Sequence, residues 1–169
     1  MFKVFVSYST LDLQNVTELR RTLVGTGVKV FVAEHSVLPS QALAPTISRA
    51  IAACDLFVLI WSKNAKASEW VSQEIGQAHS LQKRVLPLVL TEGMALPGFI
   101  SGLKYVPVFK DPAKGIVSAR NVMLRLLKAK QAALFAQRGA VQQRKKQKEK
   151  ENMALLGVGA LFLWAVSQK

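Results

Sequence analysis

The sequence predicts an α/β protein built on an open sheet of five mostly parallel strands, with helices on both faces. Five short runs rich in valine, phenylalanine and isoleucine alternate with segments of helical periodicity. Most of these runs are apolar at consecutive positions, which is typical of strands buried on both faces of a parallel sheet. The chain of 169 residues is long enough for one domain of ordinary size and an appendage.

The predicted strands share a short, apolar, β-branched character, and they cover residues 2–8, 28–33, 55–62, 84–90 and 104–109. Pro87 and Pro107 lie in the last two of them. Because proline donates no hydrogen bond to a ladder, we expect both residues near an edge of the sheet or at a bulge.

Helices are predicted between the strands, at about 13–23, 42–53 and 68–82. Gly25 and Gly27 end the first, and Ser68 is placed to cap the third. The third helix has a core stripe of Val71, Ile75 and Ala78. Residues 91–103 are weakly patterned, and we expect a loop there with at most one turn of helix.

The C-terminal third carries most of the basic charge. Residues 111–169 have a net charge of +9, out of +13 for the whole chain. Residues 113–150 predict one long helix, and residues 153–166 contain no charged side chain. As a helix this apolar segment is about 21 Å long, shorter than a hydrocarbon core of about 30 Å. We expect a short membrane anchor, with the alternative of a self-associating helix that clusters the protein.

Lysines between 145 and 150 would keep the preceding domain on the cytoplasmic face of the membrane. Nucleic-acid binding is not expected, because the basic tail lacks interleaved aromatic residues. The single cysteine, Cys54, excludes an internal disulfide and fits a reducing compartment. The N-terminus begins directly with a strand pattern and has no signal-peptide-like apolar region, which also favours the cytoplasm.

The third predicted helix contains a tryptophan and a glutamate one turn apart, Trp70 and Glu74. Glu74 falls at the boundary of the core stripe, in a helix that follows the third strand. Ligands of open α/β sheets bind beyond the carboxyl ends of the strands, where the winding reverses. If the first and third strands are neighbours, Glu74 is expected to face Tyr8 and Ser9. The alternatives are that Glu74 is a solvated helix residue and Ser9 a helix cap. Ser7 is expected to serve the fold only.

Three segments resemble TIR (Toll/interleukin-1 receptor) domains of the bacterial type: VFVSYSTLD, EHSVLPSQALAPTISRAI and DLFVLIWSKNAKASEWVSQEIGQA. The resemblance covers residues 2–125 and implies a flavodoxin-like TIR fold over residues 1–125. A basic helical stalk would then span residues 126–152, and an apolar anchor helix residues 153–169. In one place the sequence departs from the family: Ser40 replaces a glycine that is usual in the loop at 34–45. That loop gates the pocket and mediates assembly in the family.

Enzymatic members of this family cleave NAD with the glutamate of the W-x-x-x-E motif. The resemblance therefore implies a catalytic role for Glu74 and substrate contacts for Tyr8, Ser9 and Trp70, with NAD as substrate and no cofactor. It also implies self-association with other TIR domains.

One carboxylate suffices for this chemistry. Nicotinamide leaves as a neutral molecule and needs no general acid, whereas ordinary glycosidases need a second carboxyl group to protonate the leaving oxygen. Rival chemistries lack their residues. The two histidines and one cysteine have no metal-site spacing, and neither a nucleophile elbow nor a P-loop is present.

Two functions remain. The first is an NAD nucleosidase, acting by hydrolysis or cyclisation in bacterial defence or stress signalling. The alternative is a non-catalytic adaptor that acts through TIR–TIR interaction.

Overall fold

The computed structural model describes the backbone of residues 1–32 and 43–166 and the side chains as far as Met153. Most of the loop predicted at 34–45, including Ser40, lies outside the described residues. The chain forms two compact units, Met1–Leu127 and Lys128–Lys169.

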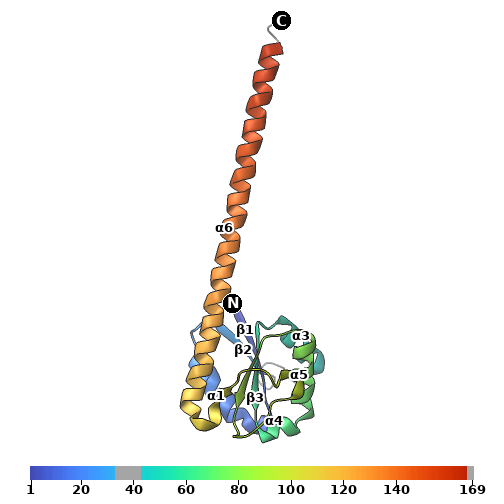
Figure 1. The fold of residues 1–169 in the computed structure, drawn as a ribbon, viewed down its shortest axis with the longest axis vertical. Coiled ribbons are helices and arrows are strands. Elements are labelled where there is room, and N and C mark those ends of the chain that lie inside the picture. Colours follow the sequence, from blue (N-terminus) through green and yellow to red (C-terminus); the bar gives the residue numbers. More distant parts are fainter. Residues whose placement is uncertain (33–42, 167–169) are drawn as a thin grey trace. The chain divides into compact units, whose positions relative to one another are not determined.

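The first unit is built on a five-stranded sheet in the order β2-β1-β3-β4-β5 (Figure 1). All four pairings are parallel. The strands are β1 (Phe2–Ser7), β2 (Val28–Phe31), β3 (Leu56–Trp61), β4 (Val85–Val89) and β5 (Val106–Pro107). The predicted fold class is therefore confirmed. The chain leaves β1 toward β2 on one side, then returns to β3 on the other, so the winding reverses between β1 and β3.

The α-helices of the described chain are α1 (Leu13–Leu23), α3 (Leu43–Ala53), α4 (Lys63–Ala67), α5 (Glu69–Ser80) and α6 (Pro112–Val166). Short 3₁₀ helices occupy η1 (Thr10–Asp12), η2 (Gly98–Ile100) and η3 (Val108–Lys110). After α1, Gly25 and Gly27 adopt φ of +73° and +84°, the left-handed conformation that stops a helix at little cost.

Helices cover both faces of the sheet (Figure 1). Even-numbered residues of β1 and β3, such as Val4 and Val58, pack under α1 and the start of α6. Odd-numbered residues, such as Phe5 and Phe57, pack under α3 and α5. This period-2 alternation decides which helix each strand-end side chain meets.

The two strand prolines lie where the ladder tolerates them. Pro107 is in β5, a two-residue strand at the edge of the sheet. Pro87 is in β4, which is not an edge strand. Leu90 donates to Trp61 of β3 and Arg84 accepts from Phe57, so even-numbered residues of β4 face β3 and Pro87 faces β5. Pairing with β5 involves Leu88 and Val89. The N–H group that Pro87 lacks would therefore point beyond the residues of β5 that pair with β4.

Helix α6 is continuous from Pro112 to Val166. Its first turns belong to the sheet-bearing unit, where Ile116, Ala119, Met123 and Leu127 are buried. Residues 131–153 are exposed. Within the described part of the chain, no helix is both long and apolar enough to cross a membrane. The membrane anchor expected at 153–166 stays a prediction.

Candidate active site

Glu74 lies in the second turn of α5, and its side chain is only 7% exposed. Its Oε2 accepts a hydrogen bond of 2.5 Å from the hydroxyl of Ser7, the last residue of β1. Ser7, like Phe5, is an odd-numbered residue of β1, so its side chain lies on the face of the sheet that α3 and α5 cover. The prediction of a boundary position for Glu74 is thus corrected: the carboxyl group is buried and has a buried partner. Ser7, expected to serve only the fold, is that partner.

Burial raises the pKa of the Glu74 carboxyl from 4.5 to about 7, and the Ser7 hydrogen bond opposes this rise. The carboxyl is therefore close to half ionised at neutral pH. A group in this state takes up its charge readily when a cation approaches. Carboxyl groups with a raised pKa of this kind cluster at catalytic and binding sites.

A second buried acid, Asp12, lies in η1 and is 7% exposed. Its carboxylate accepts hydrogen bonds from the Ser62 hydroxyl at 2.5 Å and from the Asn64 amide at 3.1 Å. Sequence reasoning missed Asp12, since both partners are some 50 residues away along the chain. A hint was available in its place just after the first strand, beside the edge where ligands bind.

Helix α4 was not predicted, because five residues are too few to show helical periodicity. Ser62 caps it by accepting from the Ala65 N–H at 3.0 Å. Ser68 then has extended φ and ψ of −87° and 118° and caps α5 by accepting from the Val71 N–H. The helix predicted at 68–82 with Ser68 as its cap is therefore confirmed as α5, and α4 is an additional short helix that precedes it.

The three predicted substrate contacts lie in different surroundings. Trp70 is 50% exposed in the first turn of α5, on the same helix as Glu74. Ser9 is buried at the N-cap of η1, and its hydroxyl makes no capping hydrogen bond. Tyr8 packs partly buried against the cluster under α1 and α6, the opposite face from Glu74. Their roles in substrate binding stay predictions.

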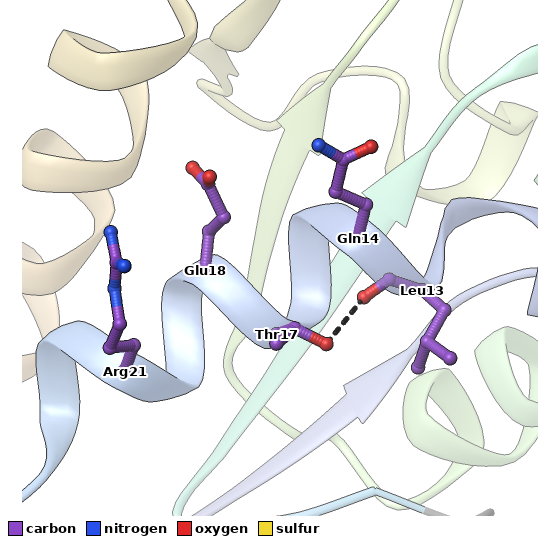
Figure 2. A pocket seen from close by; sticks show the side chains of 5 residues that line it. All are labelled: Leu13, Gln14, Thr17, Glu18 and Arg21. Carbon is purple, nitrogen blue, oxygen red and sulfur yellow. Dashed lines mark hydrogen bonds between the residues drawn. The ribbon is translucent and has the colours of Figure 1, made fainter.

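Three hollows on the described surface, at α1, at the start of α6 and beside His79, are not lined by Glu74. Figure 2 shows one of about 440 Å³ lined by one face of α1, where the Thr17 hydroxyl donates to the Leu13 carbonyl at 3.0 Å. Because a single helix lines it and Gln14, Thr17 and Glu18 are exposed, it encloses nothing. Among the described side chains, no three histidine, cysteine, aspartate or glutamate residues gather as a metal site.

Comparison with known proteins gives one family. A family model described as a TIR domain matches residues 4–121. Comparison with curated proteins finds no match.

Solved structures share the fold at low sequence identity. The TIR domain of the Toll-related receptor TRR-2 from Hydra magnipapillata has a TM-score of 0.62 and 20% identity, over 75% of this chain and 98% of that one. A prokaryotic SEFIR domain has a TM-score of 0.53 and 20% identity, over 75% and 98% of the two chains. The TIR domains of the Roq1 resistosome, which recognises the pathogen effector XopQ, have a TM-score of 0.50 and 19% identity, over 76% and 81%.

Proposed function

The chain belongs to the TIR domain family, and from that premise we propose that it is an NAD nucleosidase in which Glu74 is the catalytic carboxylate. The reaction is cleavage of the bond between ribose and nicotinamide. The observation that carries the proposal is the buried Glu74 carboxyl at the reversal of the winding between β1 and β3. Among the described residues, its recorded hydrogen-bond partner is the neutral hydroxyl of Ser7 rather than a cation.

Burial of the Glu74 carboxyl group lowers the stability of the folded protein, and nothing in the fold itself needs an acid at this position. A carboxyl group without a cationic partner is destabilising when ionised in an apolar environment. Sites that bind or transform ligands keep such groups despite this cost. The Ser7 hydroxyl occupies one acceptor position of a group that offers about four.

The chemistry follows from the charge of the substrate. The nicotinamide of NAD is a pyridinium cation, and it departs with the bonding electron pair as a neutral molecule. Positive charge develops on the ribose, as in other glycosyl transfers. Ionised Glu74 would stabilise that charge, and the attraction is stronger in a site shielded from water. Water then adds to the ribosyl cation and releases a proton, or a nucleophile within the same molecule closes a ring.

Ionisation of Glu74 links activity to pH. In the free enzyme the carboxylate form is populated above a pKa of about 7. We therefore expect kcat/KM to rise with pH through neutrality and level off above it, because kcat/KM reports groups of the free enzyme.

The test is product identification. Purified full-length protein is incubated with NAD and the mixture is separated and analysed by mass spectrometry. We expect nicotinamide to appear in step with the loss of NAD, together with ADP-ribose or a cyclic isomer. Intact NAD in the presence of folded, concentrated protein would instead support the adaptor function.

We further propose that the domain acts in bacterial defence or stress signalling by assembling with other TIR domains. High local concentration favours such assembly. Activity per molecule should then rise with protein concentration. Activity strictly proportional to concentration, down to high dilution, would contradict assembly but not NAD cleavage.

A further inference from the structure

We propose that Asp12 is a positioning residue that holds the segment after β3 in the place where Glu74 and Trp70 can act. Its function in catalysis rests on the proposed NAD nucleosidase activity, whereas its structural part stands on geometry alone. We call Asp12 with its two partners, Ser62 and Asn64, the Asp12 latch.

The latch joins two connections that lie far apart in sequence. Asp12 follows β1, and its Oδ2 and Oδ1 accept from Ser62 at 2.5 Å and from Asn64 at 3.1 Å, at separations of 50 and 52 residues. The Ser62 oxygen in turn accepts from the Ala65 N–H at 3.0 Å. One buried carboxylate thus fixes the first turn of α4 through the hydroxyl that caps it.

The latch and the Ser7–Glu74 hydrogen bond form a crossed pair. Ser7, which ends β1, donates to Glu74 of α5, the second helix after β3. The serine that follows β3 contacts the acid carried by the turn after β1. Both hydrogen bonds cross from the end of β1 and the residues after it to the residues after β3. The two segments that flank the candidate site are therefore joined at two points.

Movement of α4 reaches the site directly, because only Ser68 separates α4 from α5. Trp70 lies in the first turn of α5 and Glu74 one turn later. A small displacement of reacting groups has a large effect on rate, about 100-fold for about 1 Å. Loss of the latch should therefore lower kcat more than it weakens substrate binding.

A matched control lies at the amino ends of β1 and β3, at the other end of the same two strands. Asp55 precedes β3, and its Oδ2 accepts from the Lys3 N–H of β1 at 2.8 Å. Asp55 thus ties the same two strands together, but at their amino ends. Asp55→Asn perturbs the β1–β3 pair without touching the latch. Asn64→Ala removes one latch bond at an exposed residue, so this variant should fold even if Asp12→Asn does not.

The first measurement is hydrogen exchange by mass spectrometry on the full-length variants, without substrate. Peptides covering residues 62–70 should exchange about 10-fold faster in Asp12→Asn and Asn64→Ala, since hydrogen bonds to a charged group are among the strong ones. Asp55→Asn should leave these peptides at the wild-type rate. Equal protection in the latch variants and the wild type would overturn the latch, whether or not the protein cleaves NAD.

The second measurement is steady-state NAD cleavage. We expect Asp12→Asn to lower kcat by about 10- to 100-fold with KM changed by less than about 3-fold, while Asp55→Asn keeps the wild-type kcat. The acid limb of the pH profile should stay in place, because Glu74 still supplies it. Equal kcat in the two aspartate variants would overturn the positioning role. Full activity in Glu74→Gln would instead overturn the proposed function and leave the exchange result to decide the latch.

Discussion

Replacing Glu74 by glutamine should stabilise the protein at alkaline pH. The carboxyl is buried and its pKa is raised from 4.5 to about 7. Below pH 4.5 it is neutral in both the folded and the unfolded chain and contributes nothing. Between pH 4.5 and 7 the unfolded chain releases the proton while the folded chain retains it, so the free energy of unfolding falls as pH rises. Above pH 7 both states are ionised and the loss is complete.

The size of this loss follows from the pKa difference. At about 1.4 kcal/mol for each pH unit, it amounts to about 3 kcal/mol. Glutamine avoids it and, like the protonated acid, can still accept the Ser7 hydrogen bond as a neutral group. At pH 8 we therefore expect Glu74→Gln to be more stable than the wild type by about 1–3 kcal/mol. The melting temperature should rise by roughly 3–8 °C.

Thermal unfolding of both proteins from pH 4 to pH 9 is the assay. The two curves should meet near pH 4 and separate as pH rises toward neutrality. Glu69→Gln is the matched control, because Glu69 is exposed in the first turn of the same helix. Glu69→Gln loses a favourable interaction with the helix N-terminus, so its free energy of unfolding should fall by about 0.3–1 kcal/mol, whereas that of Glu74→Gln should rise. Identical stability of Glu74→Gln and wild type at pH 8 would refute the burial argument.

Ser7→Ala removes the hydrogen bond that lowers the Glu74 pKa, so the acid limb of kcat/KM should move up by about 1 pH unit; an unmoved limb would show that the bond does not tune the acid. Gly115→Ala should lower the free energy of unfolding by about 1–3 kcal/mol in denaturant titrations, since the added Cβ lies 2.9 Å from the Val108 Cα. Gly139→Ala meets nothing within 4 Å and should stabilise its helix by up to about 1 kcal/mol. The membrane attachment expected of residues 153–166 stays a prediction: the full chain should sediment with membranes and need detergent for release, whereas release by alkaline washing would contradict an inserted segment.

The fold class and the first four strands could be predicted from sequence because they depend on local patterns. The fifth strand, predicted at 104–109, is only Val106–Pro107 and is followed at once by the 3₁₀ helix η3. Consecutive apolar residues indicated a parallel sheet, and its winding placed the ligand edge between β1 and β3. The helix boundaries at Gly25 and Ser68 also followed from local chemistry. The short α4 did not, because one turn of helix has no measurable period.

The candidate site could be predicted only in part. Glu74 was singled out by its motif, but its buried hydrogen-bond partner, Ser7, lies 67 positions away along the chain. The alternation of side chains along β1 would have favoured Ser7 over Tyr8 as the partner of Glu74, because neighbouring residues of a strand face opposite sides of the sheet. Periodicity could not identify Asp12, because its two hydrogen-bond partners come from the connection after β3, some 50 residues away along the chain.

Nicotinamide release from NAD at pH 8 by Glu74→Gln and Glu69→Gln shows whether the Glu74 carboxylate stabilises the ribosyl cation. Loss of a transition-state electrostatic contact lowers the rate by about 10²–10³, so Glu74→Gln should lose activity to that extent while Glu69→Gln matches the wild type. Equal rates of release by the two folded variants would contradict the account.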